Sequence, residues 1–168
     1  AIGAAGSGNP AAAALDVEKL KALAATLREA RDAYWTGQVE IQEKVASAWI
    51  AFAERRTDEA LAMMRAAASL EDLTEKSPIS PGPLKPAHEL LGEMLLEAGK
   101  PAEALLEFEA TMTKEPNRFR AVYGAAQAAK AAGKRAEAAA YYAQLVTIAR
   151  QADTPARPEL TEARAAAR

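Results

Sequence analysis

Apolar residues recur every three or four positions along most of the chain, which is the spacing of one face of an α-helix. In residues 10–35 this stripe consists of Val17, Leu20, Leu23, Ala24, Leu27, Ala30 and Tyr34. Asn9 is a good N-cap residue, and Pro10 then fits the first helical position. The pattern therefore predicts one long helix from Pro10 to about Trp35, ending before Gly37.

Glycine, proline and capping residues divide the rest of the chain into further helices. These helices are expected at about 38–54, 58–73, 86–98, 101–114, 118–132, 135–150 and 158–168. Half of the residues are apolar but only 5% are aromatic, and alanine supplies most of the remainder. This composition favours closely packed helices and argues against a β protein. The sequence predicts an all-α fold of about seven helices plus a short C-terminal capping helix.

The chain is self-similar at a spacing of 34 residues. The matching pairs are Gly92 with Ala126, Gly99 with Gly133, Ala104 with Ala138, and Phe108 with Tyr142. The stretch His88-x2-Leu91-Gly92-x2-Leu95, followed by Ala104-x3-Phe108 and Pro116, resembles the tetratricopeptide repeat. His88 replaces the usual Trp and Leu95 the usual Tyr. The resemblance implies an α-solenoid of antiparallel helix pairs, wound as a right-handed superhelix.

The resemblance also divides the chain, residues 1–168, which we predict to be a single domain. The segments are a truncated helix end plus a long helix (1–40), a degenerate repeat (41–74), a proline-rich insertion (75–84), two repeats (85–118 and 119–152) and a capping helix (153–168). Gly8 and Ala13 repeat the spacing of Gly99 and Ala104, so we expect the C-terminal part of a longer chain. The chain is similar to bacterial tetratricopeptide proteins. This resemblance leaves two localisations open, the bacterial cytoplasm and export to the periplasm.

Small residues have a defined role in such a repeat. Gly92 and Ala104 are expected where the two helices of a pair cross, because a larger side chain would push the backbones apart. Phe108 is expected to fill the space between neighbouring pairs.

In tetratricopeptide proteins the first helix of each pair lines a concave groove that holds a peptide or protein partner. The residues that align with this groove are Gln42, Val45, Trp49 and Phe52, then Glu89, Glu93, Leu96 and Glu97, and finally Arg120, Tyr123, Gln127 and Lys130. The glutamates form either a solvated face or a site for a basic partner. Trp49 and Phe52 belong either to the groove or to the core. The carboxylate clamp of chaperone-binding members needs Asn and Lys at set places and is not predicted here.

The remaining composition narrows the class of function. The formal net charge is −2, which gives no field to attract nucleic acid, and no apolar run is long enough for membrane insertion. The chain has no cysteine, no glycine-rich phosphate loop and no serine or zinc motif, so neither an enzyme nor a cofactor is predicted. Two alternatives stay open: a self-associating homodimer, and a metal-binding or hydrolytic domain around His88, Glu89 and Glu93.

Overall fold

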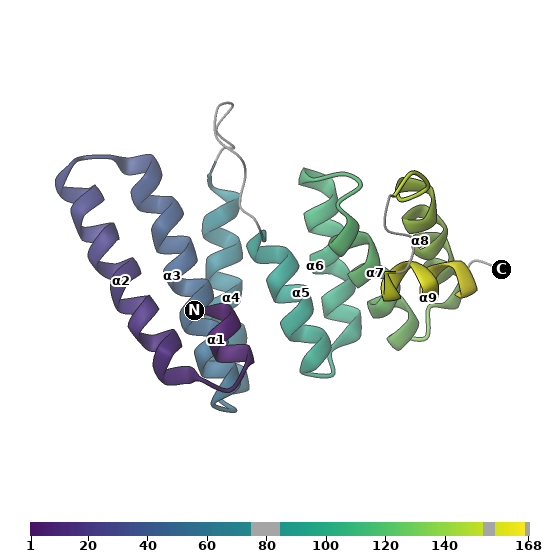
Figure 1. Cartoon of the computed structure of the whole chain (residues 1–168), viewed down its shortest axis with the longest axis horizontal. Helices are drawn as coiled ribbons and strands as arrows, with labels where there is room; N and C mark the ends of the chain where they lie inside the picture. Colours follow the sequence, from purple (N-terminus) through teal and green to yellow (C-terminus); the bar gives the residue numbers. More distant parts are fainter. Residues whose placement is uncertain (75–84, 153–156, 167–168) are drawn as a thin grey trace. The chain divides into compact units, whose positions relative to one another are not determined.

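The computed structural model describes residues 1–74, 85–152 and 157–166. These residues form nine helices and no strand, which confirms the all-α class (Figure 1). The chain divides into two compact units, residues 1–90 and 91–168. The proline-rich insertion predicted at 75–84 lies outside the described residues, as do the ends of the predicted capping segment. The boundaries of the repeats stay a prediction.

Unit 1 contains α1 (Ile2–Gly6), α2 (Pro10–Glu29), α3 (Ala33–Ala53), α4 (Thr57–Asp72) and the start of α5 (Ala87–Glu97). Helix α3 packs against both α2 and α4, and the short α1 contacts α2 and α3. Helix α1 lies where the sequence predicts the end of a helix. The core of this unit consists mainly of alanine with a few larger side chains, among them Leu61 and Met64.

Unit 2 contains the rest of α5, then α6 (Pro101–Lys114), α7 (Phe119–Ala131), α8 (Arg135–Ile148) and α9 (Pro158–Ala166). Each of α6, α7 and α8 packs against the helix that follows it in the chain. The sequence predicts these helices to within a few residues, because proline begins α6 and α9 and glycine follows α5 and α7.

The predicted helix from Pro10 to Trp35 is wrong. Helix α2 ends at Glu29, Arg31 adopts a left-handed backbone with φ of 57°, and α3 begins at Ala33. Asp32 caps α3 by accepting a hydrogen bond from the Trp35 amide at 3.1 Å. Gly37 therefore lies inside a helix rather than at its end, because one glycine costs a helix only about 1 kcal/mol.

The predicted stripe of α2 is buried only in part. Val17 and Ala24 are buried, whereas Leu23 and Tyr34 are exposed. Tyr34 belongs to the first turn of α3, so it does not share the face of α2.

One turn geometry recurs five times between helices of the described chain. Its central residue has a φ between 57° and 80° and is Gly8, Arg31, Arg55, Gly99 or Gly133. At the last of these turns the Gly133 amide donates to the Lys130 carbonyl at 3.1 Å, and the Lys134 amide donates to the Ala129 carbonyl at 2.9 Å. The other four turns have the same pair of bonds, which is the Schellman motif. Five residues after each centre lies a buried small residue: Ala13, Thr36, Ala60, Ala104 or Ala138.

Phe108 packs between two glycines of unit 2. A Cβ at Gly92 on α5 would lie 2.8 Å from the ring, and a Cβ at Gly124 on α7 would lie 2.4 Å from it. Both helices therefore approach α6 more closely than any side chain permits. The close approach predicted at Gly92 is present, and Gly124, which the repeat pattern did not identify, has a closer one; the role of Phe108 between neighbouring repeat pairs stays a prediction.

None of the helices in the three described ranges combines the length and the hydrophobicity that crossing a membrane requires.

Candidate functional site

The predicted groove residues of unit 1 lie on α3, and half of them are buried. Val45 is fully buried and Trp49 is 8% exposed, whereas Gln42 and Phe52 are partly exposed. The rings of Trp49 and Phe52 meet edge to face with centroids 5.8 Å apart. Within the described residues the buried Nε1 of Trp49 has no hydrogen-bond partner. Trp49 therefore serves the core of unit 1.

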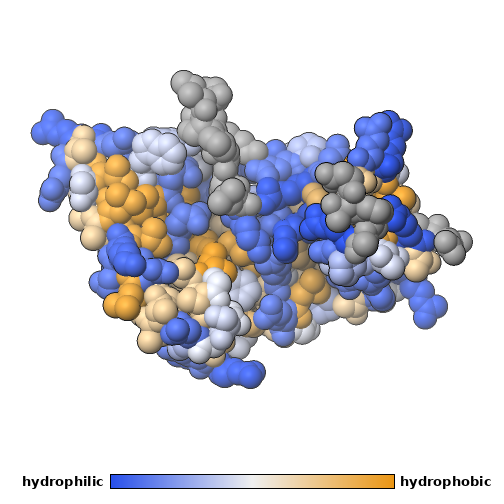
Figure 2. Space-filling view, in the orientation of Figure 1, coloured by the Kyte–Doolittle hydropathy of each residue, from blue (hydrophilic) through white to orange (hydrophobic). Residues whose placement is uncertain are grey.

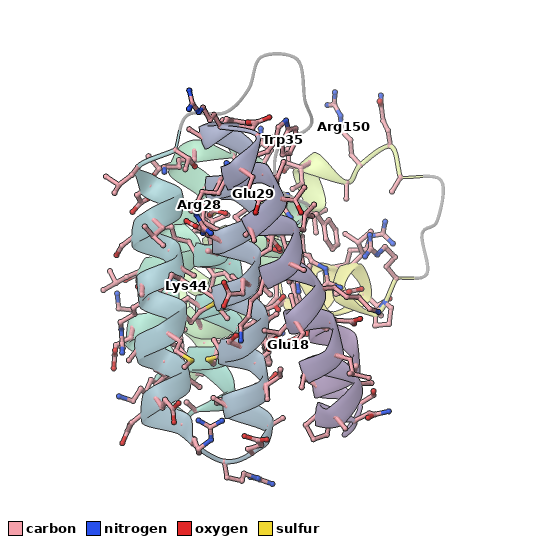
Figure 3. All side chains as sticks on the ribbon, turned by 90° about the vertical axis from the view of Figure 1, so that its left-hand side faces the viewer. Glu18, Arg28, Glu29, Trp35, Lys44 and Arg150 are labelled. Atoms are coloured by element: carbon pink, nitrogen blue, oxygen red, sulfur yellow. The ribbon has the colours of Figure 1, made fainter. Side chains whose placement is uncertain are left out.

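The exposed large apolar side chains in the described part of unit 1 lie elsewhere, on α2, at the start of α3 and, for Leu73, at the end of α4. Leu15, Leu23, Tyr34 and Trp35 are all exposed, and Figure 2 shows apolar surface over α2. The rings of Tyr34 and Trp35 pack edge to face at 5.2 Å. Figure 3 labels Trp35 at the start of α3 and Arg28 and Glu29 at the end of α2. None of these side chains belongs to the predicted groove.

The predicted glutamate face of α5 is not uniformly solvated. Glu89 has no exposed surface, Glu93 and Leu96 are partly buried, and Glu97 is exposed. Oε1 of Glu93 lies 3.5 Å from a guanidinium nitrogen of Arg120 on α7. The chain itself thus supplies a positive charge to this face. The use of these residues for a partner stays a prediction.

His88, which the metal-binding hypothesis requires, faces α4. Its Nε2 lies 3.1 Å from each carboxylate oxygen of Asp72. The described part of the chain contains no group of three His, Cys, Asp or Glu side chains arranged to hold a metal ion. The geometry therefore gives the metal-binding alternative no support.

Three of the four predicted groove residues of α7, namely Tyr123, Gln127 and Lys130, contact one residue of α9. Arg120, Tyr123, Gln127 and Lys130 lie along one face of α7, because their spacings of three and four follow the helical repeat. The Tyr123 hydroxyl donates to Oε2 of Glu162 at 2.8 Å, and Nε2 of Gln127 donates to the same oxygen at 2.7 Å. Nε2 of Gln127 also lies 2.8 Å from the Tyr123 hydroxyl.

The second oxygen of Glu162 is bound as well. Oε1 accepts hydrogen bonds from Nζ of Lys130 at 2.9 Å and from the Tyr142 hydroxyl of α8 at 2.8 Å. One carboxylate thus receives hydrogen bonds from four side chains on two helices. We name the set formed by Tyr123, Gln127, Lys130 and Tyr142 the α7–α8 carboxylate site.

The electrostatics of this site keep Glu162 ionised. Burial by itself would raise the pKa of Glu162, but hydrogen bonds from Lys130, Tyr123 and Tyr142 outweigh it and lower the pKa to about 2. Burial, together with the hydrogen bond to Glu162, raises the pKa of Tyr123 to about 12 and also raises that of Tyr142. Both tyrosines are therefore protonated donors and Glu162 is an acceptor at neutral pH.

Two members of this arrangement were not predicted. Tyr142 is expected from sequence only as the packing counterpart of Phe108, and Glu162 only as part of a capping helix. Glu162 lies next to Leu160 and Ala163, whose side chains are buried. The position of Glu162 between apolar residues of a short helix was the one indication in the sequence of its partial burial. Its partners could not be predicted, because they lie 20 to 39 positions away along the chain.

Comparison of the chain with protein-family models, with curated proteins and with solved structures found no match. A function is therefore inferred from the geometry within each unit and from the chemistry of its surface.

Proposed function

We propose that the chain is a protein-interaction module of tetratricopeptide-like helix pairs, without catalytic activity, that binds a peptide or protein partner on the polar face of α7. The observation that supports this proposal most strongly is that Tyr123, Gln127 and Lys130 all donate hydrogen bonds to one carboxylate. The resemblance to tetratricopeptide repeats indicates the same residues as lining a groove.

The chemistry of this face suits protein recognition. Tyrosine combines an apolar ring with a hydroxyl donor, which is why it is enriched where proteins bind one another. Lys130 and Arg120 supply positive charge at the exposed edge, with side chains 61% and 59% exposed. Exposed charges of this kind speed association and favour partners of complementary charge.

The test is affinity capture from cells of the source organism, with the full chain as bait and mass spectrometry as the readout. The baits are the wild type, Arg120→Glu and the control Arg135→Glu. Arg135 is exposed at the start of α8, so both variants reverse one arginine. We expect a partner that Arg120→Glu loses and Arg135→Glu keeps. Identical protein sets on all three baits would contradict the proposal.

Self-association is the second candidate, and the exposed apolar turn of unit 1 favours it. Leu23, Tyr34 and Trp35 expose apolar surface that a second copy would bury. Sedimentation velocity decides this candidate: the wild type would form a dimer that Trp35→Glu dissociates. A monomer at all concentrations would exclude it.

A further inference from the structure

We propose that α9 is an internal ligand of the α7–α8 carboxylate site, and that the partner replaces it with an acidic helix whose glutamate binds the same four donors. This inference rests on the proposed function and names the chemistry of the partner. It is carried by the geometry of Glu162, whose two oxygens take up all four donors from within the chain.

Helix α9 has the properties of a replaceable ligand. It contains nine residues, fewer than the roughly 12–15 that a helix needs to persist alone in water. The side chains that it buries completely or almost completely are Leu160 and Ala163. The Glu162 side chain is 32% exposed, so its ion pair adds little net strength, whereas its four hydrogen-bond donors restrict which group fits there. The docking of α9 is therefore selective without being strong.

The site in turn requires an acceptor. Tyr142 is 2% exposed, and its hydroxyl uses Glu162 as its acceptor. If α9 leaves, this buried donor loses its hydrogen bond, which is unfavourable unless another acceptor replaces it. A carboxylate fits better than an amide, because each of its two oxygens accepts from two donors here.

The four donors do not form a clamp of the kind that binds the terminal carboxylate of a peptide chain. They come from one helix pair, α7 and α8, and only Lys130 among them carries a charge. The bound carboxylate is a side chain in the middle of a helix, between the buried Leu160 and Ala163. The partner that matches this arrangement is a helix with a central glutamate and small or apolar neighbours.

Competition between α9 and the partner has a measurable consequence. A tethered ligand competes at an effective concentration in the millimolar range. The apparent Kd of a partner equals its intrinsic Kd divided by the fraction of chains in which α9 is undocked. Weakening α9 must therefore strengthen the binding of an acidic helix supplied from outside.

The experiment measures the fluorescence anisotropy of a labelled peptide that copies residues 158–166, with both ends blocked. Its reference is the same peptide with glutamine in place of the glutamate that corresponds to Glu162. The proteins are the full-length wild type, Glu162→Ala and the control Glu137→Ala, which removes an exposed carboxylate of α8 that pairs with Lys134. Circular dichroism of the three proteins verifies that each is folded.

We expect Glu162→Ala to bind the peptide at least about tenfold more tightly than the wild type and Glu137→Ala do. We also expect the glutamine peptide to bind more weakly, and Lys130→Met in the Glu162→Ala protein to abolish the gain. Equal affinity for all three proteins would overturn the role of α9 and leave the proposed function standing. Absence of peptide binding by Glu162→Ala would overturn the proposal that the partner is an acidic helix. The capture experiment with Arg120→Glu tests the proposed function separately.

Discussion

The ring of Phe108 occupies the space that a side chain at Gly124 would need, since a Cβ at Gly124 would lie 2.4 Å from the ring. This contact sets how closely α6 approaches α7. Helix α7 presents Tyr123 and Gln127 to the carboxylate of Glu162. The packing of one aromatic ring therefore positions the helix that carries the candidate site.

Gly124→Ala is expected to destabilise the chain. Overpacking costs about 1–3 kcal/mol, which exceeds the roughly 1 kcal/mol that alanine gains over glycine in a helix. Gly37→Ala is the matched control, because a Cβ there would meet no heavy atom within 4 Å. We expect the control to gain roughly 0.5–1 kcal/mol in urea unfolding. Equal effects of the two substitutions would show that Phe108 does not restrict position 124.

The recurring turns predict opposite effects of glycine at two of their centres. Arg55 has a φ of 66° and Gly133 a φ of 77°. A left-handed backbone is unfavourable for residues other than glycine by about 1 kcal/mol or more. Arg55→Gly should therefore raise the free energy of unfolding by about 1 kcal/mol, and Gly133→Ala should lower it by a similar amount. Thermal unfolding measures both, and a loss of stability in Arg55→Gly would contradict this account.

Trp49 is expected to behave as a core residue with an unused donor. Trp49→Phe keeps most of the buried apolar volume and removes the unpaired Nε1, so we expect a change within about 1.5 kcal/mol. Trp49→Ala should cost about 3–5 kcal/mol through the cavity that it leaves. Chemical denaturation compares them. A large loss in Trp49→Phe would indicate that Nε1 has an acceptor.

The docking of α9 should depend on acidic pH. The pKa of Glu162 falls from 4.5 to about 2 in the folded chain. Because the pKa of Glu162 is lower in the folded chain than in the unfolded chain, the ionised carboxylate stabilises the docked state at pH values above about 4.5. This contribution disappears as the pH falls from about 4.5 to 2. The protection of the α9 amides against hydrogen exchange, after correction for the pH dependence of the intrinsic rate, should decrease as the pH falls through this window in the wild type and stay nearly flat in Glu162→Gln. Identical pH profiles would contradict the role of Glu162.

The sequence predicts what local chemistry determines. Proline at position 101 and glycine at positions 99 and 133 place the ends of α5, α6 and α7, because these residues fix or permit a backbone conformation by themselves. The turn at Arg31 was missed, since its left-handed backbone has no glycine to announce it. Asp32, a favourable N-cap residue, indicated the start of α3. Gly37 led to the wrong helix end because a helix tolerates a glycine in its interior.

The candidate site was predicted only in part. Tyr123, Gln127 and Lys130 follow from their spacing on one helix face and from the resemblance to a repeat family. Val45 and Glu89 aligned with them equally well but are buried. Burial and the pairing of Glu162 depend on how distant helices pack, and periodicity along the chain does not contain that information.

The binding surface itself can be located by nuclear magnetic resonance. A ¹⁵N-labelled Glu162→Ala chain, in which the docking of α9 is weakened, is titrated with the acidic peptide of residues 158–166, and chemical-shift changes are assigned to residues. We expect saturable changes at Arg120, Tyr123, Gln127 and Lys130 and along α9, as the internal helix is displaced. Changes confined to unit 1, or none at millimolar peptide, would contradict the proposal that the face of α7 binds an acidic helix.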